Sequence, residues 1–150
     1  MKIQIIALCM FAGTLVVSCN QSSNKQISET TNDTVSKQSK AKLQIYYFHL
    51  TNRCITCNSI EANVKSVIES TYSEEIKQGL ISFESINIQE KENWEIAEQY
   101  ETANASLFLT LNTESGQHTS DLTSQAFMLS KNKPDEFKQL IQDTIKSLIK

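Results

Sequence analysis

The sequence is poor in glycine and proline and has no excess of positive charge. It holds three glycines and one proline among 150 residues, which argues against collagen-like fibres and against the glycine-rich loops that cradle phosphates in nucleotide enzymes. Its 14 Lys and Arg against 17 Asp and Glu give a net charge of -3, so no basic surface for nucleic acid is expected. Two histidines without a nucleophile elbow offer no basis for a Ser-His-Asp hydrolase. The length favours one globular domain over two.

The first residues have the pattern of a bacterial export signal. Met1 and Lys2 form a short basic start, and residues 3–17 are almost wholly apolar, a stretch that suits a secretory signal and is too short for a comfortable membrane span. The run ends in LVVSC at residues 15–19, which resembles a bacterial lipobox. The resemblance implies a lipoprotein signal peptide at 1–18, cleavage before Cys19, and lipid on its sulfur and new amino group. An uncleaved anchor and a plain secretory signal stay open, and each alternative places the domain outside the cytosol.

Residues 19–40 are expected to tether a folded domain to a membrane. Ser, Thr, Asn, Gln and Lys dominate this segment, and Ile27 and Val35 are its only apolar residues after Cys19, so it cannot bury a core. As a flexible coil it has a reach of about 25 Å. A disordered stub without a selected length is the alternative. The folded domain is therefore predicted to comprise residues 41–150.

Processing at the lipobox would leave two cysteines as thiols. Cys9 departs with the signal peptide and Cys19 is consumed by the lipid, so Cys54 and Cys57 remain, in Cys-x-x-Cys spacing. An exported domain meets an oxidising compartment, in which neighbouring thiols are expected to form a disulfide. This pair is the main functional signal in the sequence.

Hydrophobic periodicity predicts a central strand followed by a helix. Residues 43–50 are apolar on both faces and rich in aromatic and β-branched side chains, which is typical of a central strand in a covered sheet. The helix begins near Cys54 or Cys57 and carries apolar residues at helical spacing. Glu61 and Lys65, four residues apart, are expected on its wet side.

The second half of the domain completes a mixed sheet. Gly79 is expected to stop the helical region, and residues 80–88 are predicted as a strand, whose change of phase at 84–85 is typical of a β-bulge. A short helix, a strand, a hairpin turn, a returning strand and a final helix follow at 93–100, 106–112, 113–116, 117–122 and from 134 onward. Trp94 and Tyr100 are interpreted as core residues of the short helix. The order β-α-β-α-β-β-α predicts an α/β fold with a mixed four-stranded sheet and helices on both faces.

Two stretches resemble the thioredoxin-like family. One is YYFHLTNRCITC, residues 46–57, in which a central strand leads straight into Cys-x-x-Cys at the start of a helix. The other is ENWEIAEQYETANASLFL, residues 92–109, which is similar to the helix, loop and strand that face the active site in thioredoxins. The resemblance covers most of residues 43–150. It implies a minimal thioredoxin-like fold that lacks the extra N-terminal strand and helix of full thioredoxins.

The resemblance also implies that the two cysteines exchange electrons with disulfides. Unpaired N–H groups and the dipole at a helix N-terminus favour an anion, and Arg53 adds a neighbouring positive charge, so Cys54 is expected to be the exposed nucleophile. Cys57 lies one helical turn further on, faces inward, and would resolve the mixed disulfide by attacking the Cys54 sulfur. A static disulfide at the helix start and a metal-binding pair of thiolates are the alternatives.

Several positions depart from the family pattern. Asn104, Ala105 and Ser106 occupy the place where thioredoxin-like enzymes usually have a cis-proline, so Ala105 and Ser106 are candidate supporting residues of the substrate-docking turn. Arg53 stands where a tryptophan commonly precedes the first cysteine, and Ile-Thr replaces Gly-Pro between the cysteines. The buried acid of the thioredoxin strand aligns best with Phe48, so proton handling is expected to differ.

Loss of the proline opens a second interpretation, a soft-metal carrier or sensor. The resemblance implies that the proline of this family shields the cysteines from metal ions. Two thiolates without that shield can hold Cu(I) or another soft cation. His49 is a candidate third ligand beside Cys54 and Cys57, although a lone histidine at a strand end is more often packed or hydrogen-bonded. A closed four-ligand zinc site would need a second chain. A redox-silent binding module with the same fold is the third alternative.

The sequence thus predicts an envelope thiol–disulfide oxidoreductase that is lipid-anchored through Cys19 and faces the periplasm or the exterior. Its expected partner is a disulfide-containing protein or a membrane thiol carrier. We expect no nucleic acid and no cofactor to bind, and we expect the domain to be a monomer.

Overall fold

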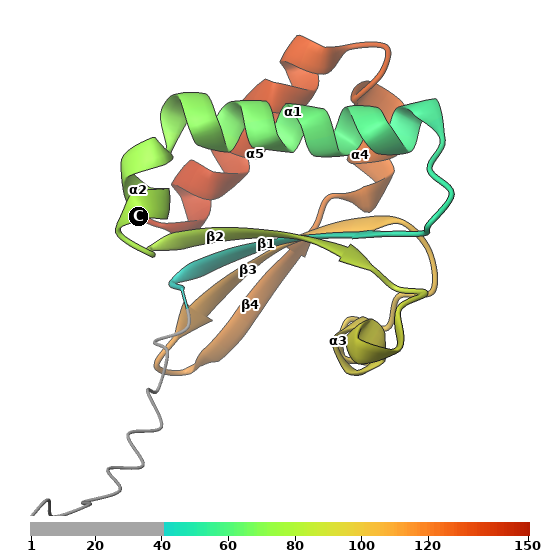
Figure 1. Ribbon diagram of the computed structural model, residues 1–150. Helices are drawn as coiled ribbons and strands as arrows, with labels where there is room; N and C mark the ends of the chain where they lie inside the picture. The colour runs from blue at the N-terminus through green and yellow to red at the C-terminus, as the bar shows by residue number, and fades with distance from the viewer. Residues whose placement is uncertain (1–40) are drawn as a thin grey trace, which may run out of the picture. The chain divides into compact units, whose positions relative to one another are not determined.

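The computed structural model describes residues 41–150, and the predicted signal peptide, Cys19 and tether lie outside them. The elements follow one another along the described chain (Figure 1) as β1 Leu43–His49, α1 Ile55–Thr71, α2 Ser73–Lys77, β2 Ile81–Asn87, η1 Lys91–Asn93, α3 Trp94–Gln99, β3 Ser106–Thr113, β4 Gly116–Asp121, α4 Thr123–Leu129 and α5 Pro134–Leu148. The predicted order β-α-β-α-β-β-α is confirmed, with the short helices α2, η1 and α4 added to it. None of the helices within residues 41–150 combines the length and the apolar character that crossing a membrane requires.

The strands form one mixed sheet in the order β2-β1-β3-β4. β1 pairs in parallel with β2, from Leu43 beside Ile81 to His49 beside Asn87. β1 and β3 are antiparallel, as are β3 and β4. Every residue of β1 is buried, because this strand lies between two others and helices cover both faces of the sheet.

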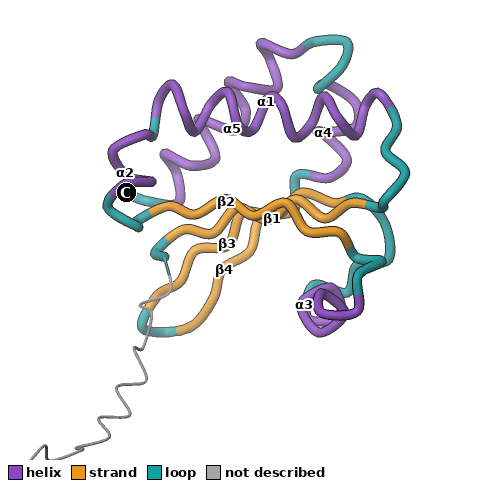
Figure 2. The backbone as a smooth tube through the Cα atoms, viewed as in Figure 1, coloured by secondary structure: helices purple, strands orange, loops and turns teal. Residues whose placement is uncertain are grey.

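Helices cover the two faces of the sheet unequally (Figures 1 and 2). α1, α4 and α5 lie over one face, and α3 lies below the other, near the end where β1 leads into α1. Alternate residues of β1 point to opposite sides. Leu43, Ile45 and Tyr47 join the larger core, whereas Tyr46 and Phe48 join a smaller cluster beside α3.

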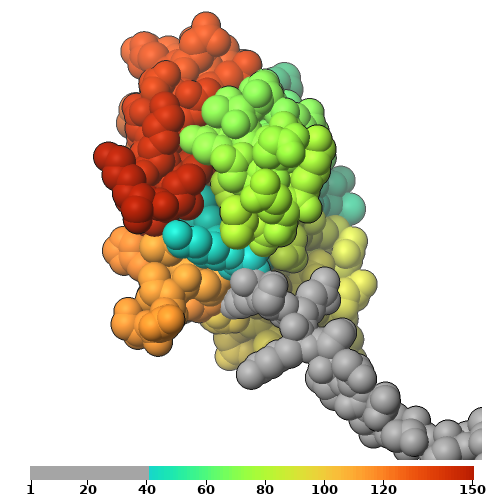
Figure 3. Space-filling model, turned by 90° about the vertical axis from the view of Figure 1, so that its left-hand side faces the viewer, coloured from blue at the N-terminus to red at the C-terminus, as the bar shows by residue number. Residues whose placement is uncertain are grey.

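The larger core lies between the sheet and the helices α1 and α5. Ile60 and Val64 of α1 meet Phe137, Ile141 and Ile145 of α5 in one buried cluster, as the helical spacing of both segments predicts. Figure 3 looks onto the end of the domain that holds α2, where α1–α2 and α5 lie side by side above the start of β1. Cys54 lies at the opposite end of α1.

The β-bulge expected at residues 84–85 is absent from β2. Its pairing with β1 runs residue by residue from Ile81 to Asn87 without an insertion. Ile81 and Phe83 pack into the core under α1, whereas Ile86 packs into the cluster beside α3. The apolar phase changes because this edge strand is covered on one face in its first half and on the other face in its second half.

α4 is a helix that sequence periodicity does not predict. It has seven residues, of which Ala126 is buried, while its Phe127 and Met128 are exposed. A single small buried residue in two turns leaves no apolar stripe for a periodicity argument to detect.

The two aromatic residues assigned to the short helix α3 have different environments. Tyr100 packs in the smaller cluster, with its ring centroid 5.1 Å from those of Tyr46 and Phe108 and 5.3 Å from that of Phe48. The core interpretation of Trp94 is wrong, because this residue is 57% exposed. Trp94 is the first residue of a six-residue helix, which is too short to bury both of its ends.

Candidate functional site

Cys54 occupies the N-cap of α1, directly after the loop that leaves β1. Its backbone is extended (φ -75°, ψ 167°), and its sulfur accepts a hydrogen bond from the Cys57 amide at 3.1 Å. The Asn58 amide donates to the Cys54 carbonyl at 3.1 Å, which starts the helical hydrogen bonds. A sulfur that receives an amide N–H at the positive end of a 17-residue helix is in a place that favours the thiolate.

The two cysteines form a disulfide, with their Cα atoms 5.0 Å apart. Cys54 is exposed, whereas Cys57 is half-buried one turn further along α1. Ile60 and Val64, the next residues on the inward side of the helix, are fully buried. Cys54 is therefore the more accessible member of the pair.

The loop before Cys54 is attached to the end of β2. The Ile88 amide donates to the His49 carbonyl at 2.9 Å. The Thr51 amide donates to Gln89 Oε1 at 2.9 Å, and its hydroxyl accepts from the Asn87 side chain at 3.0 Å. These contacts extend the β1–β2 pairing beyond the sheet and position the start of α1.

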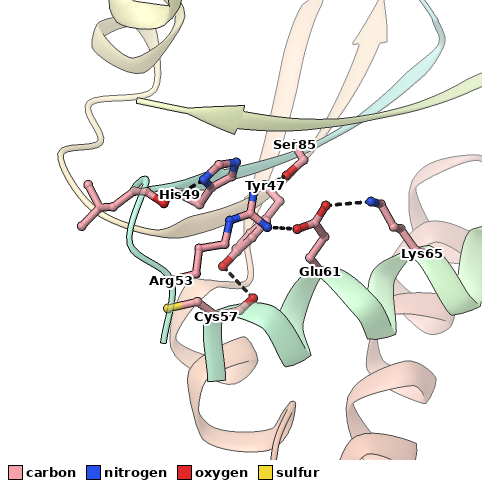
Figure 4. A network of polar contacts seen from close by, with 8 residues as sticks. Tyr47, His49, Arg53, Cys57, Glu61, Lys65 and Ser85 are labelled. Carbon is pink, nitrogen blue, oxygen red and sulfur yellow. Dashed lines mark hydrogen bonds and ion pairs between the residues drawn. The ribbon is translucent and has the colours of Figure 1, made fainter. Parts of the chain in front are cut away.

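The side chain that lies beneath the first turn of α1 is Tyr47. Its hydroxyl donates to the Cys57 carbonyl at 2.9 Å (Figure 4). Burial raises the pKa of Tyr47 to about 12, although the nearby Arg53 cation acts in the opposite direction, so this phenol is neutral near pH 7. Phe48, which the resemblance to thioredoxins sets at the position of their buried acid, points into the cluster beside α3. The strand alternates its side chains, and the phase of β1 directs Tyr47 rather than Phe48 toward the cysteines.

The Arg53 side chain lies between α1 and the sheet (Figure 4) and is 23% exposed. Its guanidinium forms an ion pair with Glu61, donates to Ser85 Oγ at 3.2 Å, and lies 6.0 Å from the Tyr47 ring centroid. Lys65 Nζ contacts the other Glu61 oxygen at 2.8 Å. The prediction that Glu61 is exposed to solvent is wrong, because Arg53 and Lys65 cover its side chain, which is only 13% exposed.

The charge state of Glu61 follows from its two cations. Burial by itself would raise the pKa of its carboxyl group, but the hydrogen bonds and charges of Lys65 and Arg53 outweigh burial and lower the pKa. Glu61 is therefore ionised near neutral pH. Arg53 is the cation predicted beside the nucleophile, and its guanidinium is paired with the Glu61 carboxylate.

Ala105 directly precedes β3, and Ser106 is the first residue of that strand, where it pairs with Phe48 near the end of β1. The Ser106 hydroxyl shares a hydrogen bond of 2.7 Å with Thr102 and donates to the Asn104 carbonyl at 3.3 Å. Every peptide bond within residues 41–150 is trans. The two residues thus lie at the sheet end from which the Cys54 loop leaves, and the side-chain hydrogen bonds of Ser106 stay within the loop before β3.

Within the described residues, no third metal ligand lies beside the two cysteines. His49 is buried, and its Nδ1 lies 3.0 Å from the Leu50 carbonyl oxygen. Within residues 41–150, no group of three or more His, Cys, Asp or Glu side chains is placed to hold a metal ion. Cys54 and Cys57 by themselves would supply two thiolates.

A shallow hollow of about 440 Å³ lies beside the loop that leads to Cys54. It is formed by the loops after β1 and β2, by α3 and by the loop before β3, with the lining residues Leu50, Ile88, Gln89, Trp94, Ala97, Glu98, Thr102 and Ala103. Sequence reasoning misses this surface, as it misses Tyr47, Glu61 and Ser85. The sequence offers one signal for Glu61, because this residue follows Cys57 by four positions and therefore lies one helical turn further along α1.

The mixed four-stranded sheet in this order, with a Cys-x-x-Cys disulfide at the start of the helix that follows its central strand, is consistent with a thioredoxin-like fold. No protein-family model and no curated protein matches the chain. Among solved structures, the chain is similar to a thioredoxin from Thermus thermophilus, with 16% identity, a TM-score of 0.43, and coverage of 70% of this chain and 75% of that one. It is also similar to a malarial protein, with 12% identity, a TM-score of 0.38, and coverage of 58% of this chain and 93% of that one.

Proposed function

We propose that the protein is a thiol–disulfide oxidoreductase, in which Cys54 and Cys57 exchange electrons with a disulfide-containing protein or a membrane thiol carrier. The observation that carries this proposal is the disulfide at the N-cap of α1, with Cys54 exposed and Cys57 half-buried. A helix N-terminus stabilises the thiolate that attacks and leaves in such exchange.

The exchange consists of two displacement steps. In the reducing direction, the Cys54 thiolate attacks one sulfur of the partner disulfide, a mixed disulfide forms, and the released partner thiolate takes a proton from water. The Cys57 thiolate then attacks the Cys54 sulfur, which forms the Cys54–Cys57 disulfide and releases the second partner thiolate. Two electrons pass from the pair to the partner, and the reverse steps oxidise a partner dithiol.

A redox titration of the full-length protein tests this proposal. The protein is equilibrated in graded thiol–disulfide buffers, and free thiols at Cys54 and Cys57 are counted by alkylation and peptide mass spectrometry. We expect one reversible two-electron transition between about -270 and -120 mV, the span of thioredoxin-type pairs.

Two results of the titration would contradict the proposal. A disulfide that persists below about -300 mV is structural, because the common cellular thiols could not reduce it. Thiols that neither titrate nor alkylate until a chelator is added would instead support the metal-binding alternative.

We also propose that the protein is located in the cell envelope. The LVVSC motif at residues 15–19 supports this location. We expect the wild-type protein to incorporate labelled fatty acid and to sediment with membranes, and Cys19→Ala to lose both properties, because the lipid would be the anchor. Cys9→Ala is the matched control, since it removes a cysteine of the predicted signal and leaves the motif intact. Membrane sedimentation of Cys19→Ala without lipid incorporation would favour an uncleaved anchor.

A further inference from the structure

The cation next to the nucleophile is held by a residue of the helix rather than left free. Arg53 precedes Cys54 in the chain, yet its guanidinium pairs with Glu61, donates to Ser85 and lies over the Tyr47 ring at 6.0 Å from its centroid (Figure 4). These partners come from α1, β2 and β1. The side chain is therefore bound between the helix and the sheet, beneath the first turns of α1.

The charges in this cluster are incompletely balanced. Glu61 contacts two cations, Arg53 and Lys65, so the three groups carry a net charge of about +1 when all are ionised. The side chains of Arg53 and Glu61 are 23% and 13% exposed, whereas that of Lys65 is 49% exposed. Solvent and salt thus screen Lys65 more than the Arg53–Glu61 pair.

We propose that Glu61 is a positioning residue that sets the reactivity of Cys54 by holding Arg53 against the sheet and cancelling most of its charge. This inference deepens the proposed function, because it names what tunes the thiol that performs the exchange. Without Glu61, Arg53 loses its carboxylate partner and its full charge acts on the neighbouring Cys54 thiolate. The thiolate is then more stable, and the dithiol form gains over the disulfide.

The alkylation rate of Cys54 in the reduced protein tests the inference without requiring any exchange partner. At one mildly acidic pH, iodoacetamide modification of Cys54 is followed by peptide mass spectrometry. We expect Glu61→Gln to raise the rate constant about twofold or more, since a lower thiol pKa increases the thiolate fraction faster than it reduces nucleophilicity. In glutathione buffers at a pH at which Cys54 is mostly thiolate, the same variant should shift the equilibrium toward the dithiol by about threefold, the equivalent of half a pKa unit.

A double-mutant cycle separates action through Arg53 from a direct effect of the carboxylate. In an Arg53→Gln background, Glu61→Gln should leave the alkylation rate unchanged, because Arg53, the cation that Glu61 holds beside Cys54, is already absent and the remaining partner Lys65 is largely screened by solvent. Glu69→Gln is the matched control, since it removes an exposed carboxylate of the same helix that has no ion-pair partner within residues 41–150. It should react as the wild type does.

Three results would overturn the inference: no change in Glu61→Gln, an equal increase in the Arg53→Gln background, or an equal increase in Glu69→Gln. If thermal unfolding shows that Glu61→Gln does not fold, Arg53→Lys provides the second test. Lysine keeps the charge but cannot make the forked contacts to Glu61 and Ser85, so this variant should also alkylate faster, and a wild-type rate would refute the inference. A failed redox titration with a positive alkylation result would reject the proposed function alone.

Discussion

Cys54→Ser is expected to abolish thiol–disulfide exchange, whereas Cys57→Ser is expected to accumulate a mixed disulfide with its substrate. The difference follows from position, because Cys54 is exposed at the N-cap of α1 and Cys57 is half-buried one turn further on. Without Cys54 the accessible nucleophile is gone, and without Cys57 the first displacement occurs but nothing resolves it. Reduction of insulin disulfides measures the first effect, and non-reducing electrophoresis with a disulfide-bonded test protein measures the second.

Thr56→Ser is the matched control for both variants, because it changes a residue between the cysteines and leaves both sulfurs in place. It should retain exchange and accumulate no mixed disulfide. Full disulfide-reducing activity in both cysteine variants would contradict the proposed function. If the wild type shows no exchange and both variants keep the binding of a captured partner, the domain would be a redox-silent binding module.

Phe48→Ala is expected to lower the free energy of unfolding by about 3–5 kcal/mol, the usual cost of removing a buried phenylalanine ring. Phe48 is fully buried, and its ring centroid lies 5.3 Å from that of Tyr100, 5.9 Å from that of Phe108 and 6.1 Å from that of Tyr46. Truncation would leave a cavity in the layer between the sheet and α3. Urea unfolding, followed by circular dichroism under conditions that keep the disulfide oxidised, measures the change.

Trp94→Ala provides the comparison on the same side of the sheet. Because Trp94 is 57% exposed, its loss should change the free energy of unfolding by no more than about 0.5 kcal/mol. An equal loss of stability in both variants would mean that Trp94 belongs to the packed layer. A cost below about 1 kcal/mol for Phe48→Ala would mean that the aromatic cluster is not packed as described.

The predictable parts of the fold are those in which buried apolar residues recur at regular spacing within one strand or helix. β1 is apolar on both faces, and α1 and α5 carry apolar stripes that the structure buries in one core. Pro134 starts α5, as its restricted φ predicts. The disulfide between Cys54 and Cys57 follows from their spacing at a strand-to-helix junction. Each of these features depends on residues close together in the chain.

Other features depend on which face of an element meets which layer. The apolar phase of β2 changes without a bulge because different layers cover its two halves. Trp94 is exposed, although its spacing from Tyr100 suits a core helix, because α3 is too short to bury it. Glu61 has the spacing of a solvent-facing residue on α1, but Arg53 covers it from the preceding loop.

The residues alone predict the order of the main strands and helices, the central place of β1 and the pair of cysteines at the start of α1, but not the short helix α4. The position of Tyr47 rather than Phe48 beneath Cys57, and the binding of Arg53 by Glu61 and Ser85, emerge from the packing of the elements against one another. The difference lies in the range of the interactions. Periodicity and capping act within one element, whereas these contacts join a strand, a loop, a helix and an edge strand, whose relative placement no local pattern specifies.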